Sequence, residues 1–558
     1  MRLSIPALAA GLAMAAAVAD AQQLPVKRQA KPTRPAITAE DLMSRLYVYA
    51  DDSLAGRASG TPYHDKATAI IAEWVKQMGL KPMGDSGTYF QSVPLVRRAW
   101  VASSVAVGDA TFTYQKDFGV FAQWVPKPFD GADVVFGGLL GDTAVHITAE
   151  QTKGKVVVFG FTPELAARGV QVEITAALTR PVGGAAAVLL PLLDNVPSEV
   201  RGFFMQSEMI SVVGGGPGMS LPPVIIATDA MAQALVGASL ASAKWGAMTG
   251  RYTGKIELQE SQAAARNVVA VLEGSDPLLK NQFIAIGAHN DHVGVRSSVV
   301  DHDSLRAYNL AVERIKDRLE PGKRPTKEQL DAIKVNVDSI RVIRRPRLDS
   351  IANGADDDGS GTVSVAEIAE AFAKDKAKPK RSILFVWHMG EEIGLVGSDW
   401  FTKHPTVPRD SIVAQFNMDM VGRGAAGDIK GGGPAYLQLV GTRRLSTELG
   451  DLVETVNKMQ KTPFTFDYTF DAAGHPENIY CRSDHWSYAR YGIPVAFFTT
   501  GLHADYHQVT DEAQYIDYPH MAAVSQFVHD VAMAAANADH RLVVDKPKPT
   551  SPNAACKQ

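Results

Sequence analysis

The stretch ILFVWHMGEE, residues 383–392, is an apolar run of strand-forming residues that ends in two adjacent carboxylates. Three further apolar runs also end at or just before a candidate metal ligand: FIAIGAH (283–289), which closes with His289, SIVAQFNM (411–418), which precedes Asp419, and IPVAFFTTGLHADY (493–506), which precedes His507. Strands alternate with helical patterns from RNVVAVLEG (266–274) to about residue 537, which predicts an α/β fold with a sheet covered by helices. Open α/β sheets bind ligands at the carboxyl ends of their strands, so we expect these side chains to share one crevice.

The composition indicates a folded chain of more than one domain. It has 558 residues, of which 46% are hydrophobic, and a formal net charge of −4. Because the charge is nearly balanced and no block of Lys and Arg occurs, nothing favours nucleic acid or an anionic membrane as a partner.

The first 21 residues have the pattern of a secretory signal peptide. Arg2 precedes an apolar run from Ile5 to Val18, and Ala19-Asp20-Ala21 forms a cleavage site before Gln22. The alternative is a membrane anchor, but the run is shorter than the roughly 20 apolar residues of a spanning helix. We therefore expect no membrane anchor and an exported protein, periplasmic or extracellular.

The two cysteines, Cys481 and Cys556, are too few to staple a fold of this size. Cys556 lies in the polar tail 539–558, whose composition predicts disorder. We therefore expect both thiols to be unpaired, although a single bridge is the alternative in an oxidising compartment.

Changes in composition and in the pattern of apolar residues along the chain predict the domain boundaries. A linker (22–37) leads to an α/β domain formed by residues 38–112 and 256–538. Short apolar runs separated by Gly and Pro predict a β-rich module at 113–255, where His146 has no metal-ligand spacing. A charged helical insertion, hinged at Pro321-Gly322, interrupts the α/β domain at 296–350.

His289 and the acidic cluster 356–358 are the first candidate ligands. On an extended chain His289 and Asp291 share a face, and a carboxylate commonly orients an imidazole ligand, which is the role expected for Asp291. The sequence Asn353-Gly-Ala-Asp-Asp-Asp-Gly-Ser-Gly361 precedes a helical pattern, so one Asp could cap that helix. Three adjacent acids exceed what capping needs.

The remaining candidates follow the later strands. Glu391 and Glu392 repel each other unless a cation or proton compensates, although a helix N-terminus also favours acids. Asp419, between two Met residues, is costly to bury unless it is paired. His507 has His503 as a nearby competitor, and Asp484 and His485 are expected to line the same pocket.

Taken together, two imidazoles and several carboxylates are enough to hold two divalent ions. Mixed nitrogen and oxygen ligands favour zinc, with manganese or cobalt as substitutes. The sequence has no G-x-S-x-G elbow and no cysteine in a nucleophile setting, which disfavours covalent hydrolysis.

With these motifs the chain resembles the co-catalytic zinc exopeptidases of metallopeptidase family twenty-eight, which include bacterial leucyl aminopeptidases, aminopeptidase Y and glutamate carboxypeptidase. The matching motifs occur in family order: LAGRASGT, RNVVAVLEG, GAHNDHVG, GADDDGSG, GEEIGLVGS, NMDMVGR, RSDHWSY and YHQVTD. The resemblance implies a mixed, mostly parallel central sheet, two Zn²⁺ ions per chain, and a protease-associated domain at 113–255.

The resemblance also implies a role for each residue. His289 and Asp419 would hold one zinc, Glu392 and His507 the other, and Asp357, three residues before the Ser of the Ser-Gly pair, would bridge both. Glu391 falls in the position of the general base, which would deprotonate a water between the metals for attack on the peptide carbonyl.

The expected activity is removal of N-terminal residues from peptide substrates. The alternatives are a carboxypeptidase or dipeptidase on the same scaffold, glutaminyl cyclase with one zinc, and a binding protein without catalysis. The insertion at 296–350 departs from simple family members. Four of its arginines, near its C-terminal end, either line the pocket rim and meet a substrate carboxylate or form a solvated basic face: Arg341, Arg344, Arg345 and Arg347.

Overall fold

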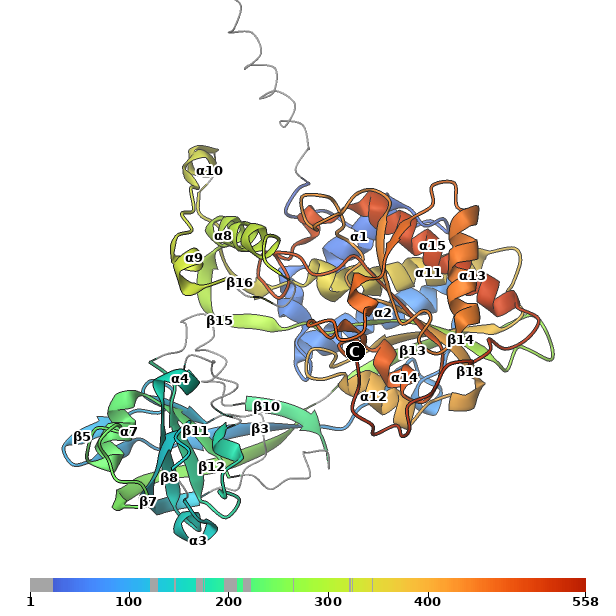
Figure 1. The fold of residues 1–558 in the computed structure, drawn as a ribbon. Helices are drawn as coiled ribbons and strands as arrows, with labels where there is room; N and C mark the ends of the chain where they lie inside the picture. Colours follow the sequence, from blue (N-terminus) through green and yellow to red (C-terminus); the bar gives the residue numbers. More distant parts are fainter. Residues whose placement is uncertain are drawn as a thin grey trace, which may run out of the picture. The chain divides into compact units, whose positions relative to one another are not determined.

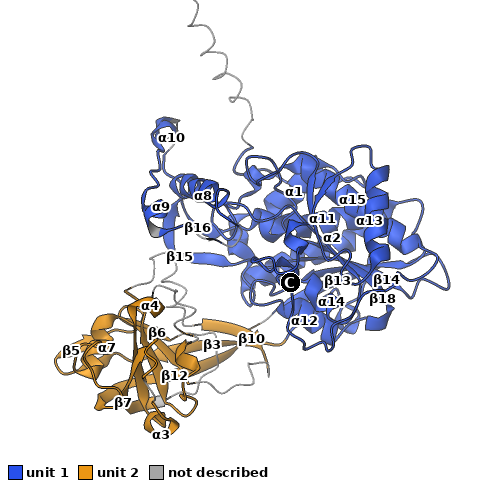
Figure 2. Ribbon diagram, in the orientation of Figure 1, with its two compact units in different colours: residues 1–93, 265–558 blue, residues 94–264 orange. Residues whose placement is uncertain are grey.

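The computed structural model describes residues 24–120, 129–144, 147–166, 174, 176–194, 208–213, 222–263, 265–320, 323, 325–343 and 345–558. The chain divides into two compact units, Pro94–Ala264 as one and Met1–Val93 with Ala265–Gln558 as the other (Figure 2). The predicted signal peptide, the Pro321-Gly322 hinge, His146 and Arg344 lie outside the described residues.

The larger unit is built on a nine-stranded mixed sheet, in the order β1-β13-β17-β14-β18-β21-β19-β20, with β2 also paired to β13. Figure 1 labels β13, β14 and β18 of this sheet. Its strands are β1 (Lys81–Pro82), β2 (Phe90–Ser92), β13 (Arg266–Leu272), β14 (Phe283–His289), β17 (Ser382–His388), β18 (Ile412–Met418), β19 (Tyr436–Val440), β20 (Thr465–Asp467) and β21 (Val495–Thr499). The central strands β17, β14, β18 and β21 are parallel, whereas β13 and β19 pair with them antiparallel. The predicted mixed α/β sheet is confirmed, with parallel pairing concentrated at its centre.

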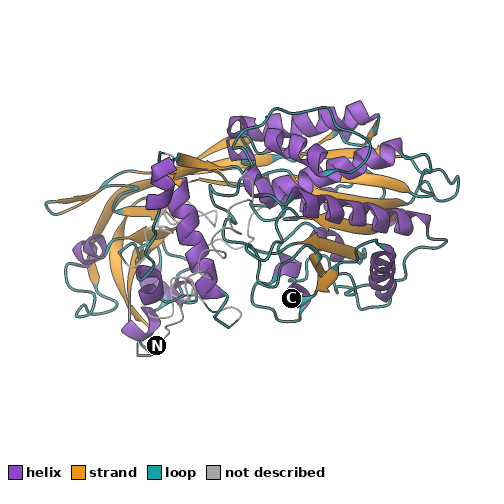
Figure 3. Ribbon diagram, turned by 90° about the horizontal axis from the view of Figure 1, so that it is seen from above, coloured by secondary structure: helices purple, strands orange, loops and turns teal. Residues whose placement is uncertain are grey.

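Helices cover both faces of this sheet, which explains why its central strands are apolar without alternation (Figure 3). Ile383, Phe385 and Trp387 of β17 pack in one cluster, while Leu384 and Val386 pack in another on the opposite face. The first cluster takes in α1 (Ala39–Tyr49), α2 (Pro62–Met78), α11 (Gly361–Lys374), α13 (Thr447–Met459) and α15 (Tyr518–Asn537), and the second takes in α12 (Val396–Lys403) and α14 (His485–Ala489). Among the residues described, none of the helices combines the length and apolar character needed to cross a bilayer.

The smaller unit contains an eight-stranded sheet in the order β10-β3-β12-β7-β8-β9-β11-β6. Its strands are β3 (Leu95–Ala102), β6 (Phe118–Val120), β7 (Phe129–Leu140), β8 (Val156–Phe161), β9 (Ala187–Pro191), β10 (Glu208–Val212), β11 (Val224–Ala227) and β12 (Met248–Ala263). Smaller elements complete it: β4 (Val105–Val107), β5 (Ala110–Phe112), α3 (Ala149–Thr152), α4 (Pro163–Ala166) and α7 (Asp229–Val236). The unit is wider than the range 113–255 expected from sequence, because β3 pairs with the second half of β12 from Leu95↔Ala263 to Ala102↔Ile256.

The helical insertion belongs to the larger unit. It begins and ends in an antiparallel ribbon of β15 (Gly294–Asp301) and β16 (Leu348–Ala352), and carries α8 (His302–Lys316), α9 (Lys327–Asp331) and α10 (Asp338–Ile343). Arg341 and Arg347 neither await a substrate carboxylate nor form a solvated basic face, because both are paired with acids of the chain. Arg341 pairs with Asp301 and Asp303 within the insertion, and Arg347 pairs with Asp349 and Glu512.

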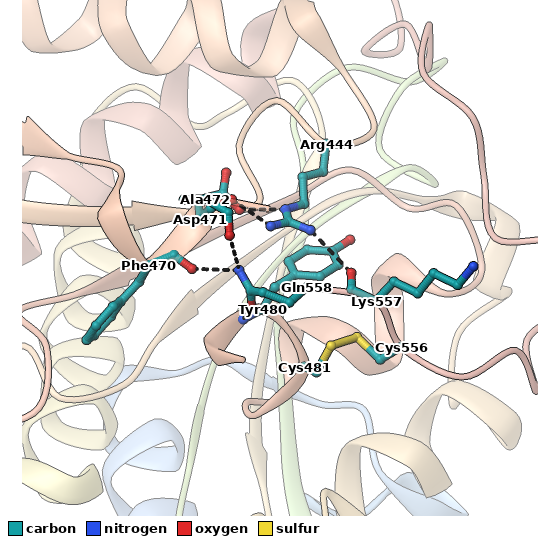
Figure 4. The surroundings of a disulfide bond; sticks show 9 residues. All are labelled: Arg444, Phe470, Asp471, Ala472, Tyr480, Cys481, Cys556, Lys557 and Gln558. Atoms are coloured by element: carbon teal, nitrogen blue, oxygen red, sulfur yellow. Dashed lines mark hydrogen bonds and ion pairs between the residues drawn. A yellow bond between two sulfur atoms is a disulfide. The ribbon is translucent and has the colours of Figure 1, made fainter. Parts of the chain in front are cut away.

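The expectation of free thiols is wrong, since Cys481 and Cys556 form a disulfide with their Cα atoms 5.7 Å apart (Figure 4). The expectation of a disordered tail also fails. Gln558 donates to the Phe470 carbonyl at 2.8 Å, its side-chain oxygen accepts from the Tyr480 amide at 2.9 Å, and Asp545 accepts from the Thr447 amide at 2.8 Å. A polar composition predicted disorder, but these partners are distant in sequence and their contacts could not be read from composition.

We predict that Cys556→Ser lowers the free energy of unfolding of the larger unit by about 2–4 kcal/mol, because the bridge closes a long loop in the unfolded chain. Its sequence separation is 75 residues. Urea unfolding followed by fluorescence measures the change. Cys481→Ser should give the same loss, and the double variant no more than either. Two free thiols in the oxidised native protein would contradict the bridge.

Candidate metal centre

Five side chains predicted as ligands meet at the carboxyl ends of the central strands. His289 Nε2 lies 3.1 Å from Asp357 Oδ1 and 3.6 Å from Asp419 Oδ1. His507 Nε2 lies 3.1 Å from Asp357 Oδ2 and 2.9 Å from Glu392 Oε2. Asp357 therefore presents one carboxylate oxygen to each histidine, so that two half-sites share one acid.

Asp358 has a different duty from its neighbour Asp357. Its Oδ2 accepts from the His289 amide at 3.0 Å, and its Oδ1 accepts from the Gly361 amide at 2.8 Å and the Met420 amide at 3.3 Å. These amides lie at the end of β14, at the start of α11 and just after β18. Asp358 thus ties together three backbone segments that carry the site, without facing it.

Asp356 also points away from the half-sites. Its Oδ1 accepts from the Gly422 amide at 2.6 Å, and its Oδ2 lies 3.1 Å from His503 Nε2. His503 is therefore engaged elsewhere, which leaves His507 at the centre. Asp511 was given no role from sequence, yet its carboxylate accepts from the amides of Asp356 and Asp357 at 3.0 Å each.

Asp291 contacts His289 by its main chain more closely than by its carboxylate. His289 Nδ1 lies 3.1 Å from the Asp291 carbonyl oxygen and 3.7 Å from Oδ1. The carboxylate accepts from Ser59 Oγ at 2.9 Å and from the Glu391 amide at 3.2 Å. Asp291 lies where an orienting residue should, and it also fixes the backbone of Glu391.

His292 belongs to the centre although the sequence had given it no role. Its Nδ1 lies 2.7 Å from Glu392 Oε1, and its ring meets the His507 ring edge-on with centroids 5.7 Å apart. Ligand atoms of His292, Asp357 and Glu392 all lie within 4.8 Å of one another. The only sequence signal was its position directly after Asp291, in the short loop that follows β14.

The family model described as Peptidase family M28 matches residues 267–532, from β13 into α15. Residues 267–532 belong to Peptidase family M28. The resemblance predicted from the motifs is confirmed, and the M28 segment contains all five predicted ligands together with His292 and Glu391.

Individual relatives match shorter parts of the chain. A probable leucine aminopeptidase of Arthroderma otae is 30% identical over 196 residues, 33% of this chain and 49% of that protein. Leucine aminopeptidase 1 of Paracoccidioides brasiliensis strain Pb18 is 32% identical over 179 residues, 30% of this chain and 43% of that protein. The chain thus spans about half the length or less of these curated relatives.

A solved structure agrees in fold over most of the chain. The aminopeptidase from Aneurinibacillus sp. strain AM-1 aligns over 91% of this chain and 97% of its own, with a TM-score of 0.50 and 17% sequence identity. At this identity the likeness shows the fold alone.

A small cavity of about 40 Å³ opens beside the M28 centre. Asp357, Glu391 and Asp419 line its acidic side. Its other side is mainly apolar and includes Phe470, Ile479, Phe497 and Leu502. Burial raises the pKa of Glu391 well above its usual range, against the opposing effect of His289.

The structure corrects the expectation for Asp484 and His485, neither of which lines this cavity. Both are fully buried. The His485 ring stacks on Phe497 with centroids 4.8 Å apart, because α14 starts there and turns into the apolar cluster beneath. Arg482 and Ser483 line the cavity instead, and Ser483 Oγ donates to Asp419 Oδ2 at 2.7 Å.

The donor set of the M28 centre fits a divalent cation such as zinc. Zinc bonds of about 2.1 Å in a tetrahedron place ligand atoms about 3.4 Å apart, close to the separations within each half-site. His289 Nε2 is buried and has no hydrogen-bond partner among the residues that the structure describes. Burial lowers the pKa of His507, but Asp357 and Glu392 outweigh burial and raise that pKa to about 10. The carboxylates thus create a field that favours added positive charge.

We predict that zinc stabilises the metal-free protein. At a free zinc concentration about 100 times the Kd, one site adds about 2.7 kcal/mol to the free energy of unfolding. Differential scanning calorimetry after chelator treatment, with and without zinc, measures the change. Asp357→Ala should abolish the rise in Tm because both half-sites lose a ligand, whereas Glu73→Ala on the exposed face of α2 should keep it. An unchanged wild-type Tm would contradict the site.

Proposed function

We propose that this chain is a zinc-dependent aminopeptidase that holds two Zn²⁺ ions. The observation that carries this proposal is the Asp357 carboxylate, which offers one oxygen to His289 and the other to His507 beside a cavity lined by Glu391. His289, Asp419 and Asp357 would hold one ion. Glu392, His507 and Asp357 would hold the other, with His292 beside them.

Zinc, when bound, supplies Lewis acidity that polarises a peptide carbonyl and makes water more acidic. The chain itself supplies the proton acceptor. Glu391 faces the cavity without a hydrogen-bond partner for its carboxylate among the described residues, and its backbone is held by Asp291. In the proposed reaction Glu391 takes a proton from the attacking water and returns it to the leaving amine nitrogen.

The charges around the cavity favour an aminopeptidase over a carboxypeptidase. The residues that line the cavity include three acids and a single basic side chain, Arg482. The cation at its wall, Arg482, is already engaged: it donates to Tyr506 Oη at 3.1 Å and pairs with Glu477 at 3.3 Å. A carboxypeptidase would need a cation that is free to meet a C-terminal carboxylate.

The apolar wall of the cavity suits an apolar side chain at the N-terminus of the substrate. Phe470, Ile479, Phe497 and Leu502 present hydrocarbon and aromatic surface close to the acidic side. The two relatives described above carry the name leucine aminopeptidase, which supports the same preference.

Export is a separate proposal. The Cys481–Cys556 bridge supports it, because disulfides persist in oxidising compartments such as the periplasm and the cell exterior. The signal-peptide pattern of residues 1–21 points the same way.

A substrate panel tests the aminopeptidase proposal. Leucine anilide and leucyl peptides with a free amine should be hydrolysed, N-acetylation should abolish hydrolysis, and C-terminal amidation should have little effect. Loss of activity on C-terminal amidation would favour a carboxypeptidase, and a requirement for both free ends would favour a dipeptidase. Cyclisation of N-terminal glutamine with one zinc per chain would favour glutaminyl cyclase. Zinc binding without turnover would favour a binding protein.

We predict that Glu391→Gln preserves zinc content while turnover falls by at least ~10²-fold, because the amide cannot accept the proton. Metal analysis and kcat on leucine anilide measure the two effects. Glu73→Gln, which removes an exposed carboxylate on α2 that does not line the cavity, should keep normal turnover. Near-normal kcat in the Glu391 variant would remove Glu391 from the reaction.

A further inference from the structure

The two histidines of the centre are held in different ways. His289 ends β14 and its side chain is 0% exposed. His507 lies in a loop after β21, which we call the His507 loop (residues 501–515), and its side chain is 35% exposed. No strand fixes His507, and its φ of 58° is in the left-handed region, which is uncommon for a residue other than glycine. The position of His507 therefore depends on what holds this loop.

The helical insertion forms an ion pair with the His507 loop two residues before His507. Arg306 Nε of α8 lies 3.3 Å from Asp505 Oδ2, and Asp505 is fully buried. The same oxygen accepts from Arg423 Nη2 of the catalytic core at 3.0 Å. Asp505 Oδ1 accepts from Thr510 Oγ1 at 2.7 Å, which closes the loop on itself around His507. One buried carboxylate thus joins the loop to the core on one side and to the insertion on the other.

The insertion makes two more polar contacts after His507. Arg296 of β15 donates to Gln508 Oε1 at 3.2 Å, directly beside His507 in sequence. Arg347, just before β16, pairs with Glu512. The Arg296 contact is to the residue next to His507. The Arg347 contact is to the residue next to Asp511, whose carboxylate accepts from the amides of Asp356 and Asp357.

An aromatic contact holds the end of the loop. The Tyr515 ring stacks on the His302 ring, with centroids 5.9 Å apart and planes inclined by 20°. The guanidinium of Arg306 lies over the same ring, 3.9 Å from its centroid. Arg306 therefore reaches both Asp505 and Tyr515, the two positions that bracket the ligand-bearing part of the loop.

We infer that residues 294–352 act as a clamp that places His507 for the zinc ion shared with Glu392, with Arg306 as its main positioning residue. Arg306 touches neither the cavity nor a proposed ligand. It acts through Asp505, two residues before His507. The inference rests on the proposed two-ion centre. It gives the insertion a function in assembling the second half-site.

The test uses the full metal-free chain titrated with Zn²⁺ alone in competition with a chromophoric chelator. His507→Ala identifies the binding step that belongs to the His507 half-site. Arg306→Met, which keeps the hydrocarbon stem, should weaken that step by about 10–100-fold, the usual effect of losing a group that orients a ligand. The step assigned to His289 and Asp419 should be unchanged.

Two designs separate positioning from general destabilisation. Arg314→Met on the same helix is the matched control, because Arg314 is exposed and should leave both steps unchanged. The double variant Arg306→Met/His507→Ala should bind zinc no more weakly than His507→Ala alone, since Arg306 acts through His507. Arg296→Met, which loses only the contact to Gln508, provides a second arm if the Arg306 variant fails to fold.

The outcomes separate the clamp from the two-ion centre on which it rests. Two zinc steps in the wild type with a selective loss in Arg306→Met or Arg296→Met support the clamp. Two unchanged steps in both variants, or additive losses in the double variant, overturn the clamp and leave the proposed function standing. Fewer than two zinc ions in the wild type overturn the proposed two-ion function and the clamp with it.

Discussion

The buried carboxylate of Asp357 is the constraint on which the rest of the centre depends. A buried acid must be compensated, and Asp357 faces an imidazole from each side, which holds its pKa well below the usual range despite burial. Its two oxygens can face two half-sites only if its backbone is fixed. Asp511 supplies that restraint by accepting its amide, while Asp358 fixes the strand end that carries His289. Asp358 and Asp511 thus fix the backbone around the site, whereas Asp357 itself supplies negative charge to both half-sites.

The sequence predicted the parts of the centre that follow from strand ends. Apolar runs ending in His289, Glu392 and Asp419 implied one crevice, because parallel strands carry their following residues to one edge. The family motif selected Asp357 within the acidic cluster, and the structure brings that residue between the two histidines. The sheet itself was predictable because its central strands are buried on both faces and therefore read as continuous apolar runs.

Other features could not be predicted, since they depend on contacts between distant segments. The duties of Asp356 and Asp358 follow from which amides lie near them. The Cys481–Cys556 bridge joins residues 75 apart, and the tail that carries Cys556 has a composition typical of disorder. His485 is polar and was therefore expected to line the pocket. It lies instead at the start of α14, where its ring packs against the apolar cluster. Arg306 resembled one charge among many on a solvated helix, because its partner Asp505 lies about two hundred residues further on.

Charge balance links the acids of the cavity to the number of cations that the centre would hold. Asp357, Asp419, Glu391 and Glu392 would carry four negative charges when ionised, and the imidazoles must be neutral to act as ligands. One divalent ion would leave two negative charges in a largely buried space, which is costly unless protons compensate. Two divalent ions balance all four. Two ions would thus balance these four acids, whereas with one ion two of the four would need protons. The proposed clamp on the His507 loop would matter for the same reason, since a second cation would depend on the less firmly held histidine.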